Sequence, residues 1–214
     1  FNPDFIAHPD YSKPKSYYQN FFQPFDIPPL KLVMQWNRHT EGFLTRSTDG
    51  QYVVFSGYDA ALATASITSS TSAAVPRVIG RLAGDGTLDT TTALTDAISG
   101  GNPRSTAATT GTDLWLSGTS TGGGIRYATL GATTSTSLAT TPTNLRALGI
   151  FGGQLYTSSQ SGAFRLATIG TGTPTTAGQT ITNLPGFPTS SGSPYGFFFA
   201  DLDAGVAGPD TVYV

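Results

Sequence analysis

Residues 102–130 contain a pattern of short strand-prone stretches and glycine turns that recurs along most of the chain. Small residues at 106–109 precede a turn at Thr110–Asp113, and Leu114–Ser117 is rich in residues that favour strands. After a glycine-rich turn, Ile125–Leu130 alternates apolar with polar side chains, which indicates a strand with one buried face. The stretch therefore predicts one antiparallel β-unit.

The same order of turn and strands occurs in three other segments. In the first of them, Asp49-Gly50 between two apolar runs is a strong hairpin signal, and Ala60–Ala74 is predicted to be a looped insertion. Superposing the turn-and-strand units places four residues in one column: Val54, Trp115, Tyr156 and Tyr213. The spacing predicts an all-β fold, a partial β-propeller of about three and a half four-stranded blades. The expected blades are residues 41–100, 101–142, 143–190 and an incomplete 191–214.

Charge and cysteine usage exclude several functions. Only 11% of the residues are charged and the net charge is −2, so no broad cationic surface is available for nucleic acid or an anionic membrane. The longest apolar run is far too short to span a bilayer. Without cysteine there is neither a disulfide framework nor a thiolate metal site.

Residues 1–40 differ from the repeats, because they contain every lysine and both histidines but none of the 26 glycines. Their prolines and aromatic clusters predict an extended arm rather than a helix. The arm is expected either to cover its own domain or to bind a partner chain through Tyr17, Tyr18, Phe21, Phe22 and Phe25. A start at Phe1 suggests that an upstream segment was removed.

Several strings resemble a repeat region of large exported bacterial proteins: GTLDTTTALTDAISGGNPRS, GIRYATLGATTSTSLATTPTN, IFGGQLYTSSQSG and LPGFPTSSGSPYGFFFADL. The resemblance covers residues 41–214. It implies a β-propeller, a secreted or cell-surface location and further blades after Val214, and it supplies no catalytic residues. Residues 1–40 depart from that pattern.

Two arginines are the main candidate ligand-binding residues. Asn102-Pro103-Arg104 and Asn144-Leu145-Arg146 occupy the same place before the innermost strand of their repeats. Two guanidinium groups near one mouth of a central channel would bind a carboxylate or sulfate. The alternative is that each arginine bonds backbone carbonyls between blades.

Other motifs carry weaker signals. The alternating carboxylates Asp201 and Asp203, followed by Asp210, are a candidate Ca²⁺ loop, although they lack the distal glutamate of an EF-hand and are more typical of a solvated turn. Gly118–Gly122 matches the G-x-S-x-G pattern of hydrolases, but more glycines follow instead of a helix, which favours a plain turn. No other cofactor is expected.

These features favour a non-catalytic binding or structural module of an exported protein. Because the last repeat stops within a predicted strand, another protein chain or missing blades are expected to complete its sheet. The ligand is expected to be a glycan or a small anion, if there is one. Two alternatives stay open: a fragment of a polysaccharide lyase or glycosidase, and a surface-assembly subunit that docks by its arm.

Overall fold

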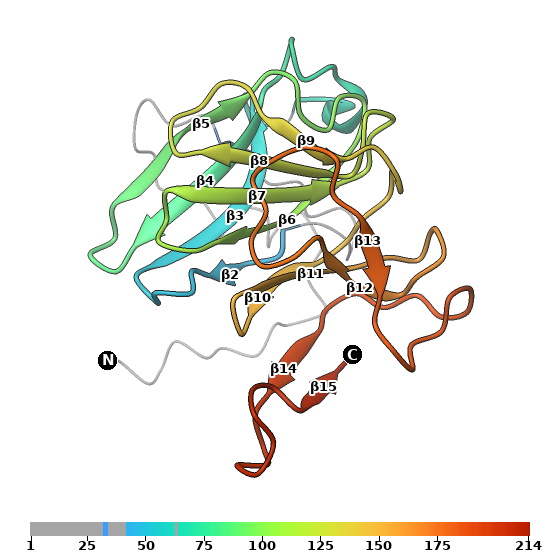
Figure 1. The fold of residues 1–214 in the computed structure, drawn as a ribbon. Helices are drawn as coiled ribbons and strands as arrows, with labels where there is room; N and C mark the ends of the chain where they lie inside the picture. Colours follow the sequence, from blue (N-terminus) through green and yellow to red (C-terminus); the bar gives the residue numbers. More distant parts are fainter. Residues whose placement is uncertain (1–31, 34–41, 63) are drawn as a thin grey trace, which may run out of the picture. The chain divides into compact units, whose positions relative to one another are not determined.

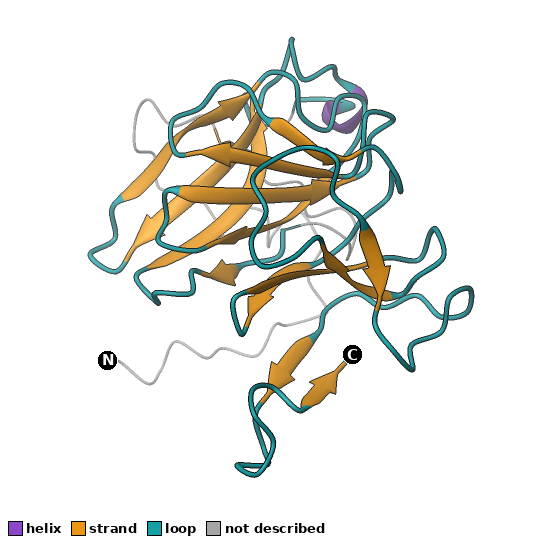
Figure 2. Cartoon of the chain, in the orientation of Figure 1, coloured by secondary structure: helices purple, strands orange, loops and turns teal. Residues whose placement is uncertain are grey.

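A computed structural model describes residues 32–33, 42–62 and 64–214 of the chain. All of these described residues belong to one compact unit. The described chain is all-β, with a single-turn 3-10 helix at Ile67–Ser69 (Figure 2). None of the described segments is a helix of the length and apolarity needed to cross a membrane. The predicted all-β class is therefore confirmed.

The described strands form four antiparallel sheets, one for each predicted repeat (Figure 1). The first sheet contains β1 (Leu32–Val33), β2 (Thr45–Arg46), β3 (Tyr52–Asp59), β4 (Arg77–Ala83) and β5 (Leu88–Leu94). β1 and β2 both pair with β3, which is followed in order by β4 and β5. The expected turn at Asp49-Gly50 lies between β2 and β3, and Ala60–Ala74 is the expected insertion between β3 and β4.

The second and third sheets are four-stranded meanders whose strands pair in chain order. The second contains β6 (Pro103–Ala108), β7 (Asp113–Gly118), β8 (Ile125–Thr129) and β9 (Thr136–Ala139). The third contains β10 (Leu148–Phe151), β11 (Gln154–Ser158), β12 (Leu166–Ile169) and β13 (Ile181–Asn183). The fourth sheet is a hairpin of β14 (Phe198–Ala200) and β15 (Thr211–Tyr213).

Consecutive sheets pack against each other in chain order. Between the first and second sheets lies one apolar cluster, with Val54, Ile79 and Leu94 on one side and Ala108, Leu114 and Leu116 on the other. Between the second and third lies another, with Ala107, Trp115 and Ile125 facing Leu148, Leu155 and Ala167. Because side chains alternate along a strand, one face of the second sheet enters each cluster, and this sheet is buried on both faces.

The column of four residues is confirmed as one structural position. Each member lies on the second strand of its repeat unit and pairs with the first, as in Thr45↔Val54 and Ala107↔Trp115. Val54 and Trp115 are buried in the clusters that join their sheet to the following one. The residue at this position therefore faces the next sheet.

Glycine permits the closest backbone approach in the second sheet. A Cβ atom on Gly101 would lie 1.6 Å from the carbonyl oxygen of Thr119, and one on Gly118 would lie 2.2 Å from that of Asn102. These distances are far below van der Waals contact, so only glycine allows the start of β6 to approach the end of β7 this closely.

We expect Gly101→Ala to lower the free energy of unfolding by about 2 kcal/mol or more, because the backbone of 119 must move to admit the methyl group. The matched control is Gly84→Ala, since a Cβ there meets nothing within 4 Å; its effect should stay within about 0.5 kcal/mol. Denaturant unfolding of both variants measures the difference. Equal midpoints would contradict the proposed close approach.

Candidate functional site

Arg104 lies on β6 and bonds the segment that leads into the third sheet. Its Nη1 donates to the side-chain oxygen of Asn144 and, at 3.2 Å, to the carbonyl oxygen of Leu145. Nearly the whole side chain is buried. The guanidinium group therefore connects the second sheet with the chain entering the third.

Arg146 repeats this arrangement one sheet further on. Its Nη1 donates to the carbonyl oxygens of Ser193 and Pro194 at 3.3 and 3.4 Å, and its Nη2 donates to Oε1 of Gln160. The ring of Tyr195 lies over the guanidinium carbon at 4.0 Å, a cation–π distance. Arg146 thus connects the third sheet with the chain entering the fourth.

The two arginines bond different partners and each contacts carbonyl groups of the following repeat. The sequence left two roles open for these arginines, an anion site or hydrogen bonds to backbone carbonyls of a neighbouring repeat. The observed contacts are of the second kind. Binding of an anion by Arg104 and Arg146 stays a prediction.

A serine two residues after the column position makes a second set of contacts between sheets. Ser117 donates its hydroxyl to the carbonyl oxygen of Arg146, and Ser158 donates to that of Tyr195 at 2.6 Å. Ser56 occupies the same place in the first sheet and is also buried. Sequence reasoning missed these residues, although the strings VVFS, LWLS and LYTS that end in them are visible in the repeats.

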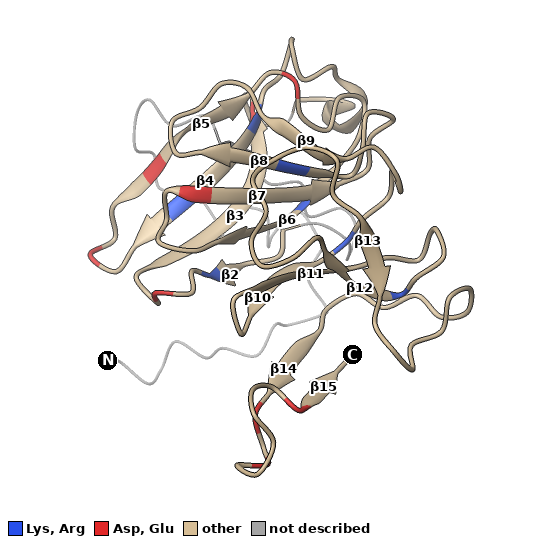
Figure 3. Cartoon of the chain, in the orientation of Figure 1, with Lys and Arg blue, Asp and Glu red and all other residues tan. Residues whose placement is uncertain are grey.

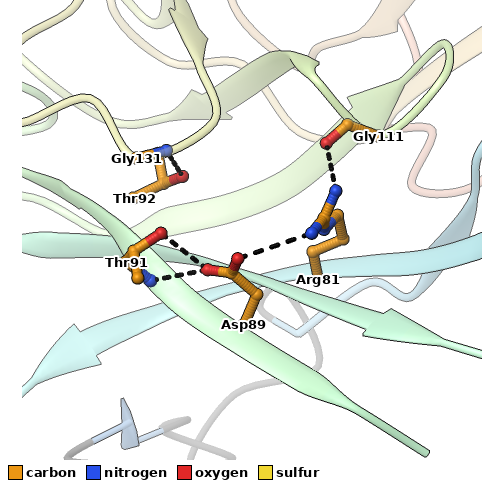
Figure 4. Close-up of polar contacts among 6 residues, drawn as sticks. All are labelled: Arg81, Asp89, Thr91, Thr92, Gly111 and Gly131. Carbon is orange, nitrogen blue, oxygen red and sulfur yellow. Dashed lines mark hydrogen bonds and ion pairs between the residues drawn. The ribbon is translucent and has the colours of Figure 1, made fainter.

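Arg81 connects the first and second sheets through a different contact (Figure 4). Its Nη1 donates to the carbonyl oxygen of Gly111 at 3.2 Å, and its Nη2 pairs with Asp89 at 3.4 Å. Burial acts to raise the pKa of Asp89, but hydrogen bonds from Thr91 and the charge of Arg81 outweigh it and hold this pKa below its ordinary value.

Arg77 is fully buried without a carboxylate beside it in the described chain, a feature that sequence reasoning did not single out. It donates to the carbonyl oxygens of Ser70, Val75 and Ile98, and it lies 4.9 Å from the ring centre of Tyr58. Burial lowers its pKa. The arginine holds the end of the 60–76 insertion against the first sheet.

An aromatic cluster attaches the fourth sheet to the third. Tyr156 lies 4.4 Å from Phe199 between ring centres, and Phe151 lies 5.1 Å from Phe199 and 6.0 Å from Phe197. Tyr156, the column residue of the third sheet, therefore also faces the next sheet. Tilted ring pairs at these distances add to the stabilisation from apolar burial.

Tyr127 and Asp113 form a hydrogen-bonded pair of ionisable side chains. The hydroxyl of Tyr127 donates to Oδ1 of Asp113 at 2.6 Å, and its ring lies 5.5 Å from that of Trp115. Burial, followed by the hydrogen bond to Asp113 and its negative charge, raises the pKa of Tyr127 to about 12.

The carboxylates proposed to bind Ca²⁺ lie in the loop between β14 and β15 (Figure 3). Asp210 accepts from the amides of Leu202 and Asp203, and Asp203 accepts from the amide of Gly205. Its bonds to Thr211 and to these amides lower the pKa of Asp210. Within the described chain, no three acidic or metal-binding side chains gather closely enough to hold an ion. Calcium binding stays a prediction.

Ser120 of the G-x-S-x-G match lies in a turn after β7, as expected, and its Oγ accepts from the amide of Gly122 at 3.3 Å. Strand β8 follows the turn, so the strand-to-helix arrangement of a nucleophile elbow is not formed here. The aromatic arm residues Tyr17, Tyr18, Phe21, Phe22 and Phe25 lie outside the described residues.

Comparison with protein-family models, with curated proteins and with solved structures found no match to this chain.

Arg146→Ala tests whether this arginine holds the sheets together. Because it removes a buried guanidinium group that donates to three acceptors of the third and fourth repeats, we expect the free energy of unfolding to fall by about 2 kcal/mol. Arg46→Ala is the control, since its side chain bonds only the turn carbonyl of Gly50, and it should cost less than about 0.5 kcal/mol. Denaturant unfolding measures both. Unchanged stability together with lost sulfate binding in a calorimetric titration would instead support the anion site.

Tyr127→Phe tests the perturbed phenol. The fold favours the neutral phenol of Tyr127. Its contribution to the free energy of unfolding is therefore fully present below the ordinary pKa of 10.0 and is lost as the pH rises towards about 12. The variant should be less stable by about 1 kcal/mol at neutral pH and should lose less stability at alkaline pH. Urea unfolding across this pH range measures the difference. An identical alkaline decline in both proteins would contradict the assignment.

Proposed function

We propose that this chain is a non-catalytic binding or structural module of an exported or cell-surface protein, built from consecutive β-propeller blades. Its fourth sheet offers a surface that β-strands of another chain, or of further blades, complete.

Three features support the propeller arrangement. The second and third sheets are meanders of four strands, the number typical of a blade. Each sheet packs on the one that follows it in the chain. The first strand of the second sheet, β6, is lined by small residues such as Ser105 and Ala107, which allow close approach where blades converge.

The exposure of the last column residue carries the binding proposal. Val54 and Trp115 are 0% and 1% exposed beneath the following sheet, whereas Tyr213 is 56% exposed. Its cross-strand neighbour Phe198 is 58% exposed. Paired residues of an antiparallel ladder point to the same face, so these two rings form an exposed apolar surface. The edge of this surface meets the third sheet, where the ring of Phe198 packs edge-on against Phe151 at 5.6 Å.

An exported location is supported by composition and by the resemblance of residues 41–214 to repeat regions of exported bacterial proteins. Glycine, serine and threonine dominate the described sheets, and charged side chains are scarce.

Sedimentation velocity tests the exposed surface. We expect the chain to sediment as species larger than its 22.2 kDa monomer as its concentration rises, because open sheet surfaces associate. Tyr213→Lys should shift the equilibrium towards monomer by placing a charge on that surface. Leu62→Lys is the matched control, since Leu62 is 66% exposed but lies in the insertion of the first sheet.

A concentration-independent monomer, with amide hydrogens of 211–213 that exchange slowly, would overturn the proposal. Such a result would mean that the fourth sheet needs no neighbour.

A further inference from the structure

A long loop of the third sheet extends to the second sheet (Figure 1). The connection from β12 to β13 has eleven residues, 170–180, whereas the equivalent connection from β8 to β9 has six, 130–135. Both loops hydrogen-bond the preceding sheet, the shorter one through the carbonyl oxygen of Ala132 and the longer one through the amide of Gln179. A short loop is therefore sufficient for this contact, and the additional residues of the longer loop serve another purpose.

Hydrogen bonds from two sheets hold the longer loop in one shape. From the second sheet, Nε1 of Trp115 donates to the carbonyl oxygen of Pro174 at 2.8 Å. From the third sheet, Oε1 of Gln154 accepts from the amide of Gly172 at 2.8 Å, and the amide of Leu155 donates to the carbonyl oxygen of Gly172 at 2.8 Å. These contacts use backbone atoms of the loop, so they fix its shape and leave its side-chain hydroxyl groups available.

A pocket of about 600 Å³ lies along this loop, a volume typical of small-molecule sites. None of the described residues that line it is charged. Six threonines contribute hydroxyl groups to the lining: Thr171, Thr173, Thr175, Thr176, Thr180 and Thr182. Among the residues that the structure describes, only the hydroxyl of Thr176 has a hydrogen-bond partner, Nε2 of Gln179 at 3.3 Å. The other five hydroxyl groups are available to a ligand.

The lining of the pocket favours a neutral ligand that is rich in hydroxyl groups. An ion would lose water on binding without gaining a partner of opposite charge, which is unfavourable. An apolar ligand would meet mainly hydroxyl and backbone groups, because Pro174 is the one apolar side chain of the lining. A threonine hydroxyl both donates and accepts, and so does each hydroxyl of a sugar. The fixed loop also lowers the entropic cost of binding, because its backbone is already ordered.

We infer that the pocket formed by residues 170–182 binds a neutral carbohydrate. The inference rests on the proposed function and deepens it, because it specifies an uncharged glycan rather than a small anion as the ligand and places the site in the third sheet. The residues that line the pocket include no aromatic ring, so binding depends on hydrogen bonds that compete with water. A dissociation constant on the order of 1 mM is therefore expected for a short oligosaccharide.

An NMR titration of the full ¹⁵N-labelled chain tests the inference. The probes are neutral hexasaccharides of glucose, mannose and xylose, together with an acidic hexasaccharide of galacturonic acid. We expect at least one neutral probe to shift the amide signals of 170–182, because its hydroxyl groups bond the threonines of the pocket. The acidic probe should cause no comparable shift, since the lining offers no positive charge.

A double variant, Thr173→Val with Thr175→Val, removes two hydroxyl groups from the pocket and keeps the branched shape of both side chains. We expect its affinity for the neutral probe to fall about tenfold. Thr134→Val is the matched control, because Thr134 is exposed in the equivalent loop of the second sheet. The control should bind as tightly as the unaltered chain. Urea unfolding of both variants checks that the fold is retained.

The inference would be overturned if no neutral probe shifted the signals of 170–182. Equal binding of the acidic probe, or undiminished affinity in the double variant, would also overturn it. Each of these results leaves the proposed function standing, because sedimentation tests the exposed surface of the fourth sheet separately. A concentration-independent monomer that still bound the neutral probe would instead remove the fourth-sheet surface and retain the carbohydrate site.

Discussion

The structure depends on carbonyl oxygens of one repeat being bonded by donors from the repeat before it. Ser117 bonds the carbonyl of Arg146, Ser158 bonds that of Tyr195, and Arg104 bonds that of Leu145. A carbonyl buried between two sheets without a donor costs about 1–3 kcal/mol, so these contacts decide which sheet lies next to which. Apolar packing alone does much less to specify which two sheets lie side by side and in which register they pack.

The same contacts explain how a chain with few charges holds so many buried arginines. An isolated buried cation is unfavourable, but a guanidinium group spreads its charge over five donors and is more weakly hydrated than an ammonium. Arg77 and Arg146 are surrounded by carbonyl and amide oxygens rather than by carboxylates. Arg81, in contrast, pairs with the carboxylate of Asp89.

Much of the fold could be predicted from the sequence, because turn chemistry and alternation act over a few residues. Asp49-Gly50 marked a hairpin, and the column from Val54 to Tyr213 identified equivalent strands. Strand ends were predicted less well: β6 begins at Pro103, three residues before the small residues at 106–109 that marked it in the sequence. For Arg146 the sequence left two roles open, and the role of Ser117 was missed, since both residues bond partners in another repeat that only the packed sheets bring near.

The bonds from Ser117 and Ser158 all run in one direction, from a donor on one repeat to an acceptor on its successor. Such contacts are heterologous, like the head-to-tail contacts of a protein polymer, and each new unit presents the surface that the following unit requires. Gene duplication can therefore lengthen such an array, because each added repeat uses the same interface. Whether a row of this kind closes into a ring or advances as a spiral is then decided by the rotation that each serine contact imposes.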